Sequence, residues 1–190
     1  MGFDSDIVIA INGFNNPFMD ELMWIISKPT TWIPLYVLLL VLLWIKIKDW
    51  RKMVIILVGF AVAVGMSDFI CSGILKPVVC RLRPTHDPNM PMLHLVHKYR
   101  GGLYGFCSSH AANSMAVAML FSLLYRKKIV TALLMVWVTI VCYSRIYLGV
   151  HFPTDIIAGL VIGCLLAVVT WLVLSIAYRV DDAESPRGDS

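Results

Sequence analysis

Two residues near the end of the chain have the types and spacing of a nucleophile and its orienting acid. His151 and Asp155 are four residues apart, which places both side chains on one face of a helix. A carboxylate bonded to one ring nitrogen leaves the other nitrogen free and basic. That nitrogen could attack a phosphate ester, and water would then hydrolyse the phosphohistidine. Taken alone, the pair is better explained by an Asp155 that caps a helix and an interfacial histidine beside it than by a catalytic pair.

Three cations and one helix start are candidate binding groups for the phosphate. Such a transfer requires that the charge on the non-bridging oxygens be neutralised. Lys76, Arg83 and Arg145 carry the matching charge, and arginine binds two phosphate oxygens at once. Ser108 and Ser109 open an apolar stretch, where the free amides of a helix start favour an anion. Any one of these cations alone would be more typical of snorkelling to lipid headgroups.

His110 follows the two serines and is the candidate proton donor. Expulsion of an alkoxide or phosphate leaving group is slow without a positioned acid. The same histidine would act as the base that activates water in the second step. The alternative is a histidine at a helix start that is bonded to a loop carbonyl.

The elements that position these residues are apolar. The chain has 190 residues, of which 59% are hydrophobic and 15% charged, which indicates an integral membrane protein. Stretches long enough to span a bilayer are residues 31–47, 53–75, 108–125, 129–148 and 156–178. We therefore expect an all-α, polytopic transmembrane bundle with five clear spans.

The two ends of the chain differ from this pattern. Acidic residues flank two short amphipathic pieces, 7–11 and 18–26. We expect two interfacial helices there, although residues 5–28 could form a sixth, broken span. No basic start or unbroken apolar stretch typical of a cleavable signal peptide is present. We expect one membrane domain over residues 1–180 and a polar tail over 181–190.

Alternation of the five spans places all three polar motifs on one face of the membrane. The opposite face then carries short basic connections, which remain in the cytoplasm: Lys46, Lys48, Arg51, Lys52, Arg126, Lys127, Lys128 and Arg179. We expect a multi-pass protein of the bacterial inner (cytoplasmic) membrane with its active site facing the periplasm.

The combined motifs resemble a known family. Lys76-x6-Arg83-Pro84, Ser108-Ser109-His110 and Ser144-Arg145-x5-His151-x3-Asp155 are similar to the three signatures of the type 2 phosphatidic acid phosphatase (PAP2) superfamily. The resemblance runs from about residue 52 to the end of the last span. It implies a helical bundle and metal-independent catalysis without a cofactor. It also implies the roles given above to the residues of these motifs.

Two residues depart from the family pattern. The second signature usually reads Pro-Ser-Gly-His, whereas this chain has Cys107 in place of the proline and Ser109 in place of the glycine. The loss of both changes how rigidly the turn presents its amides but retains the hydroxyl and the histidine. Ser109 is tolerable if its backbone does not require a positive φ.

The expected function is therefore that of a membrane lipid phosphatase. Its expected partners are a phosphorylated lipid and the bilayer, with no nucleic acid and no obligate protein partner. Undecaprenyl pyrophosphate and lipid A phosphate rank first, and phosphatidylglycerol phosphate and phosphatidic acid next. The alternatives are a lipid-to-lipid phosphotransferase and a non-catalytic lipid-binding or transport bundle. The superfamily's soluble vanadate-dependent haloperoxidases do not match the membrane character of this chain.

Other polar residues have less specific interpretations. His94 and His97 could hold a metal, but no cysteines or carboxylates nearby complete the site. We expect the basic loop 85–106 to contact a headgroup and to close over the site as a lid. Asp68 is expected to be structural, bonded to a polar neighbour inside the bundle. The five cysteines are expected to be buried thiols, with a Cys80–Cys107 disulfide as the alternative.

Overall fold

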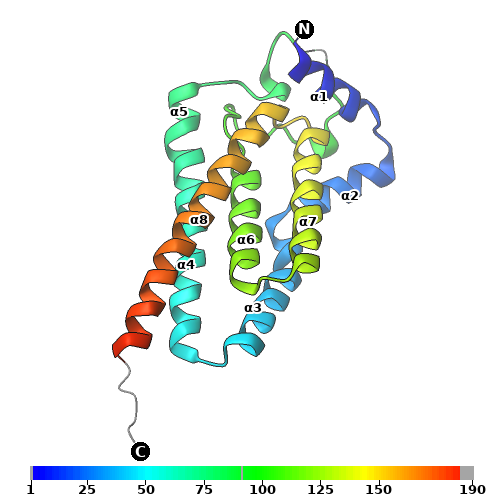
Figure 1. Cartoon of the computed structure of the whole chain (residues 1–190). Coiled ribbons are helices and arrows are strands. Elements are labelled where there is room, and N and C mark those ends of the chain that lie inside the picture. Colours follow the sequence, from blue (N-terminus) through cyan, green and yellow to red (C-terminus); the bar gives the residue numbers. More distant parts are fainter. Residues whose placement is uncertain (1, 91, 185–190) are drawn as a thin grey trace, which may run out of the picture.

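The protein is a bundle of helices (Figure 1). The computed structural model describes residues 2–90 and 92–184, with side chains as far as residue 177. The longer elements are α1 (Phe3–Gly13), α2 (Pro17–Ser27), α3 (Ile33–Ile47), α4 (Trp50–Asp68), α6 (Ser109–Tyr125), α7 (Lys128–Tyr147) and α8 (Pro153–Glu184). Shorter turns are η1 (Pro29–Trp32), η2 (Phe69–Leu75), α5 (Lys76–Val79), η3 (Pro84–His86) and η4 (Val96–Lys98). The expectation of an all-α membrane bundle is confirmed.

Among the described residues, four helices are long and apolar enough to cross a membrane. They comprise Pro29–Ile47, Trp50–Val79, Lys128–Tyr147 and Pro153–Ala177. The remaining predicted span, 108–125, corresponds to α6, which has 17 residues and packs against α4, α7 and α8. The count of five spans stays a prediction.

Close contact between α6 and α8 holds the start of both helices together. Gly159 and Gly163 of α8 face the backbone of α6, where a Cβ at either position would overlap the carbonyl oxygen of Ser108 or Ala112. Small residues allow membrane helices to approach this closely. The contact therefore places Ser108 and its neighbours beside the first turn of α8.

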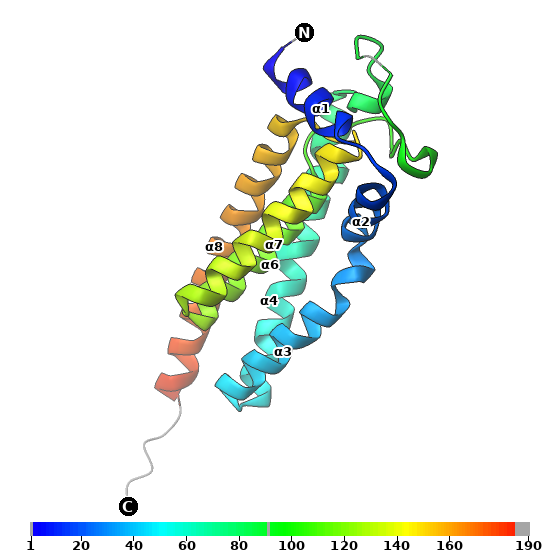
Figure 2. The same cartoon turned by 90° about the vertical axis from the view of Figure 1, so that its right-hand side faces the viewer.

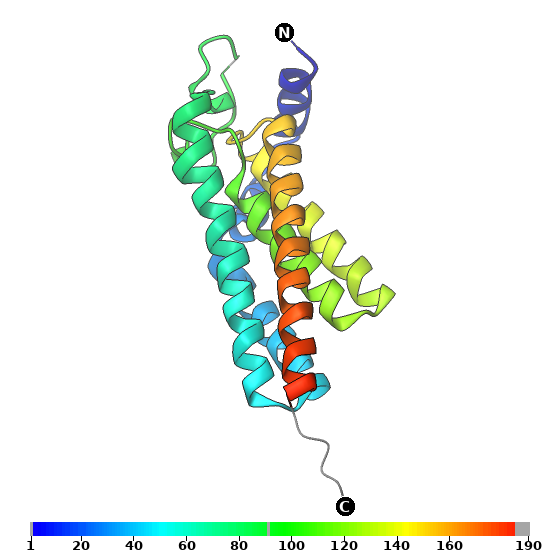
Figure 3. The same cartoon turned by 60° about the vertical axis from the view of Figure 1, so that its left-hand side comes forward.

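One long helix carries Lys76 to its position. Figure 3 shows α4, η2 and α5 as one continuous rod beside α8. The segment Phe69–Leu75 is a π-helix, which was not expected within the predicted span 53–75. A π-helical turn changes the rotational register of the residues that follow. It therefore sets which side of the rod Lys76 faces.

Two short helices precede the first span. α1 extends the predicted piece 7–11 by four residues at its start and two at its end, and α2 extends the piece 18–26 by one residue at each end. The Asn16 side chain caps α2 by accepting a hydrogen bond from the amide of Met19 at 3.0 Å. Figure 2 shows α1 across the end of the bundle, near the loop between α5 and α6. Their position at a membrane interface stays a prediction.

The far end of the chain differs from the predicted boundary at residue 180. Helix α8 continues to Glu184, so no helix end marks that boundary. The rest of the predicted polar tail lies outside the described residues.

Candidate active site

The three polar motifs meet at one end of the bundle, where α5 ends, α6 begins, α7 ends and α8 begins (Figure 1). His151 and Asp155 are both almost fully buried there. Their Nδ1 and Oδ2 atoms are 3.7 Å apart, which is longer than a hydrogen bond. Oδ2 instead accepts a hydrogen bond from the amide of Phe152 at 2.9 Å. The predicted pair is present, in a geometry that would tighten when substrate binds.

Arg81 binds the other carboxylate oxygen of Asp155. This arginine lies outside the three sequence motifs and was not predicted as part of the site. Its Nη1 donates to Asp155 Oδ1 at 2.9 Å and to Thr154 Oγ1 at 2.6 Å, while Nη2 donates to Asp4 Oδ2 at 2.7 Å. Asp4 belongs to α1 and also accepts a hydrogen bond from the Thr154 hydroxyl. The sequence feature that could have identified Arg81 is its place two residues before Arg83. One phosphate-binding arginine in this motif does not explain a second arginine so close by.

Lys76 is held by hydroxyl groups at the mouth of the site. Its Nζ donates to Ser72 Oγ at 2.9 Å and to Ser109 Oγ at 3.0 Å, and the two hydroxyls are 2.8 Å apart. Ser72 also donates to Asp68 at 3.4 Å, so Asp68 has the expected polar neighbour, but both residues are exposed rather than inside the bundle. Ser109, which replaces the usual glycine, thus positions the ammonium group. Ser72 was missed, although it lies one helical turn before Lys76.

The two arginines of the motifs are buried and only partly paired. Arg83 Nε donates to the carbonyl of Tyr104 at 3.1 Å, and Arg145 Nη1 donates to the Ser27 hydroxyl of α2. Arg83 Nη1 and Arg145 Nε have no hydrogen-bond partner within the described part of the chain. Unpaired buried donors on a cation are costly unless an anion compensates them. A phosphate group would provide that compensation.

The start of α6 is fixed against α8. The amide of Ser108 donates to the carbonyl of Asp155 at 3.0 Å, and Ser108 Oγ accepts from the amide of Ala111 at 3.4 Å. The Ser108 hydroxyl therefore caps the helix. His110, in the first turn, lines a cavity that extends along α6.

The surroundings of His151 keep its ring neutral. The residue lies between α7 and α8, outside the membrane-spanning segments. Burial lowers its pKa well below the ordinary histidine value, and Arg145, Arg83 and Lys76 lower it further. A neutral imidazole is the form that can act as a nucleophile.

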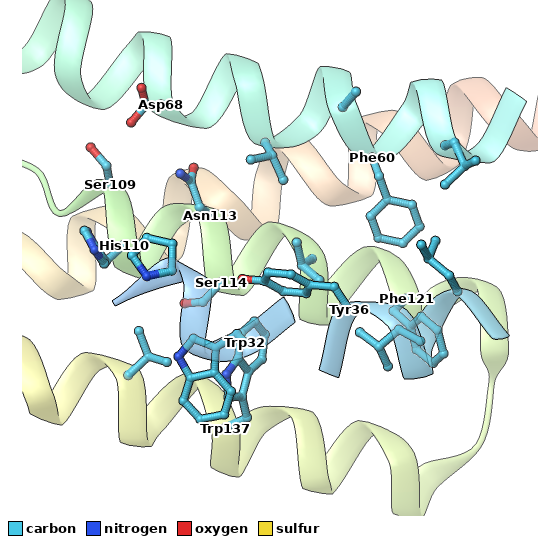
Figure 4. Close-up of a pocket in the computed structure, with 18 of the residues that line it drawn as sticks. Trp32, Tyr36, Phe60, Asp68, Ser109, His110, Asn113, Ser114, Phe121 and Trp137 are labelled. Atoms are coloured by element: carbon cyan, nitrogen blue, oxygen red, sulfur yellow. The ribbon is translucent and has the colours of Figure 1, made fainter. Parts of the chain in front are cut away.

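An apolar cavity of 610 Å³ leads away from Ser109 and His110 between α3, α4, α6 and α7. Figure 4 shows His110, Asn113 and Ser114 along its α6 wall, with Tyr36 and Trp32 across from them. Asp68 also lines this cavity. A cavity that is polar at the catalytic end and apolar beyond it suits a lipid whose phosphate enters the site.

The loop between α5 and α6 is tied to the N-terminal helices. Asn12 donates to the carbonyls of His94 at 3.0 Å and of Tyr147 at 2.8 Å. His94 and His97 each lie 2.8 Å from a carboxylate of α2, on Asp20 and Glu21. These histidines therefore dock the loop onto α2, and its movement as a lid stays a prediction.

The glycines of this loop allow its backbone to approach the site. Gly101 has a φ of +70°, and an added Cβ would lie 2.5 Å from Arg83 Nη1. At Gly105 a Cβ would lie 3.0 Å from Asp155 Oδ2. A side chain at Gly101 would be strained by its positive φ, and one at Gly105 would press against the Asp155 carboxylate.

The alternative disulfide between Cys80 and Cys107 is not formed, since all five cysteines are free thiols. Cys107 is buried beside Cys71 and Ala112, whereas Cys80 is exposed at the end of α5 with its Sγ 2.9 Å from the Pro77 carbonyl. The expectation of buried thiols holds for Cys71, Cys107 and Cys142, whereas Cys164 is only partly buried and Cys80 is exposed.

Comparisons with known proteins agree with this arrangement. A lipid A 4'-phosphatase of Bacteroides thetaiotaomicron is 33% identical over 93% of this chain and 78% of its own length. A lipid A 4'-phosphatase of Porphyromonas gingivalis is 35% identical over 84% of this chain and 68% of its own length. The crystal structure of Aquifex aeolicus LpxE has a similar fold, with a TM-score of 0.68 over 90% of this chain and 95% of its own, at 21% identity.

The family assignment rests on a match that covers two thirds of the chain. The family model of the PAP2 superfamily matches residues 53–179, which contain all three motifs and the cations gathered around His151. The chain therefore belongs to the PAP2 superfamily and is a bacterial membrane lipid phosphatase.

Proposed function

We propose that this phosphatase removes a phosphate group from an acylated envelope lipid, with the phosphate of lipid A as the first candidate. The observation that carries the proposal is a neutral, buried His151 among three cations, in a site whose Ser109 and His110 line an apolar cavity. The names of the two lipid A phosphatases above support this substrate. Undecaprenyl pyrophosphate comes second, followed by phosphatidylglycerol phosphate and phosphatidic acid.

In the first step, Nε2 of His151 attacks phosphorus and the bond to the leaving oxygen breaks. Asp155 orients the ring from the Nδ1 side. Lys76, Arg83 and Arg145 bind the non-bridging oxygens, whose charge is spread in the transition state. The Ser108 amide is bonded to the Asp155 carbonyl, so the amides of Ser109 and His110 at the start of α6 would add to this binding.

His110 completes both steps. It donates a proton to the leaving oxygen, which contributes about 10²- to 10⁴-fold in such reactions. It then takes a proton from water as that water attacks phosphorus, and the P–N bond breaks. Inorganic phosphate leaves, and His151 returns to its neutral form.

The site is proposed to face the periplasm. Short basic connections at the other end of the bundle support this orientation, including Lys46, which donates to the carbonyls of Leu124 and Tyr125 at the end of α6. A lipid of the outer leaflet would then present its phosphate to the site while its chains remain in the bilayer.

The test is phosphate release by the purified protein from a panel of these lipids. His151→Ala should abolish release without changing thermal unfolding in detergent. His97→Ala is the matched control, because this histidine is half-exposed and pairs with Glu21 outside the site. Activity retained by His151→Ala would refute the mechanism.

Two additions separate the alternatives. Addition of an acceptor lipid distinguishes hydrolysis from phosphotransfer, because free phosphate should remain the main product of a hydrolase. Inhibition by vanadate that persists in a chelator would support the metal-independent site, whereas a strict requirement for a divalent metal would contradict it.

A further inference from the structure

Two residues that line the 610 Å³ cavity each carry one buried polar atom without a partner in the described part of the chain. Trp137 Nε1 is a donor on α7, and its residue is only 6% exposed. Asn113 Oδ1 is an acceptor on α6. Neither atom forms a hydrogen bond within the described part of the chain, because most of the surrounding side chains are apolar. Buried polar atoms of this kind are uncommon and require an explanation.

Both residues line the same cavity as His110. Asn113 is three residues after His110, about 4.5 Å farther along the axis at 1.5 Å per residue. Trp137 comes from the facing helix, and its ring is held by edge contacts with Trp32 and Tyr36 at centroid distances of 5.7 and 6.1 Å. Figure 4 shows Asn113 and Trp137 on opposite sides of the cavity near His110. The two groups are therefore placed to meet the part of a lipid that follows its phosphate.

The chemistry of the two atoms distinguishes between kinds of lipid. An unpaired buried donor or acceptor costs about 1–3 kcal/mol, and a bilayer core supplies no water to satisfy it. A polyprenyl chain is pure hydrocarbon after its phosphates, so it would leave both atoms unpaired. An acylated lipid carries ester or amide carbonyls and hydroxyl or amide N–H groups near its phosphate, which match the indole donor and the amide acceptor.

We infer that Asn113 and Trp137 form a polar subsite that selects acylated phospholipids over polyprenyl phosphates. Trp137 donates to an ester or amide carbonyl, and Asn113 accepts from a hydroxyl or amide N–H of the same lipid. This inference rests on the proposed function and deepens it by naming the substrate class.

The volume of the cavity is compatible with such a ligand. A cavity of about 150 Å³ holds one benzene ring, so 610 Å³ accommodates on the order of twenty carbon atoms. That is enough for the linkage region and the first part of an acyl chain, while the remainder extends into the bilayer.

The variants for the test are Asn113→Leu and Trp137→Phe, which remove the polar atom and retain most of the volume. Val117→Ala is the matched control, because Val117 lines the same cavity one turn beyond Asn113 and has no polar side-chain atom. Each protein is assayed for phosphate release from lipid A and from undecaprenyl pyrophosphate in mixed micelles.

Loss of one hydrogen bond should lower the preference for the acylated lipid, expressed as a ratio of kcat/KM values, by roughly five-fold through KM. Val117→Ala should affect both lipids alike. An unchanged ratio in both polar variants, or an equal loss on both lipids, would overturn the inference. If one polar variant does not unfold cooperatively in detergent, and so is not properly folded, the substrate preference of the other variant tests the inference.

A binding measurement separates this inference from the proposed reaction. Diacylglycerol and a polyprenol of similar carbon number lack phosphate, so their effect on thermal unfolding reports the cavity alone. Diacylglycerol should raise the Tm of the wild type more than the polyprenol does, and this difference should disappear in both polar variants. Equal shifts by the two ligands would overturn the inference, whereas failure of the wild type to release phosphate would overturn only the proposed function.

Discussion

Replacement of Arg81 by methionine would test whether this side chain positions Asp155. Its guanidinium joins Asp155, Thr154 and Asp4 through three hydrogen bonds of 2.6 to 2.9 Å. A hydrogen bond to a charged group contributes about 1.5–3 kcal/mol. Because the Arg81 side chain is 31% exposed while that of Asp155 is fully buried, we expect a loss of about 2 kcal/mol in the free energy of unfolding.

The effect on catalysis should be larger in kcat than in KM. Arg81 holds the carboxylate that orients His151 in the proposed mechanism, and a misplacement of about 1 Å at a reacting group can cost on the order of 100-fold. We expect kcat to fall about 10- to 100-fold with KM within about two-fold of the wild type, measured by phosphate release. Arg81→Lys should recover part of kcat, since it retains a charge but cannot reach both carboxylates as a fork.

Asp4→Asn is the matched control for this experiment. It removes the outer ion pair and keeps an amide oxygen that can still accept from Thr154. The Asp4 side chain is 18% exposed, and exposed pairs contribute about 0.2–1 kcal/mol. If Arg81→Met retained kcat within two-fold while Asp155→Asn lost most activity, Asp155 would orient His151 without help from Arg81. The reasoning above would then be refuted.

Four further outcomes follow from the same structure. Ser109→Gly, which restores the usual family residue, should raise KM about five-fold because Lys76 loses one of its two hydroxyl partners; an unchanged KM would mean that Ser72 alone suffices. Gly163→Ala should lower the free energy of unfolding by about 1–3 kcal/mol through overlap with α6, whereas Gly65→Ala, with open space around its Cα, should not destabilise the protein. The pKa of His151 is lowered on folding, so the unfolded chain binds the proton first and stability should fall as pH drops below about 6.5, by at most about 1.36 kcal/mol per pH unit; in His151→Gln this component of the pH dependence of Tm should be absent. Finally, exposed Cys80 should react with a membrane-impermeant maleimide added to spheroplasts if the site faces the periplasm, and Cys80→Ser should remove the label; labelling only after lysis would reverse the proposed orientation.

The sequence predicted the gathering of the motifs because their spacing reports local geometry. His151 and Asp155 are one helical turn apart, and Lys76 and Arg145 each lie at the end of an apolar stretch. Alternation of the spans was then sufficient to bring these residues to one face. The reaction class followed from residue types alone.

The contacts that hold the site could not be predicted in the same way. Arg81 and Asp155 are 74 residues apart, and Arg145 and Ser27 are 118 apart. Such pairs depend on how the helices rotate against one another, which local spacing does not determine. The π-helical turn at Phe69–Leu75 is a further example, because apolar residues in this segment suit an α-helix equally well.

The N-terminal helices have a consequence for how the protein can be divided. The family match begins at residue 53, yet three residues before that point hold parts of the site. Asp4 bonds Arg81, Asn12 bonds the loop between α5 and α6, and Ser27 bonds Arg145. A truncated protein that starts at the homologous region would retain each motif residue and lose the groups that immobilise two of its arginines. The unit shared across the family is therefore smaller than the unit that must fold together for the site to be rigid.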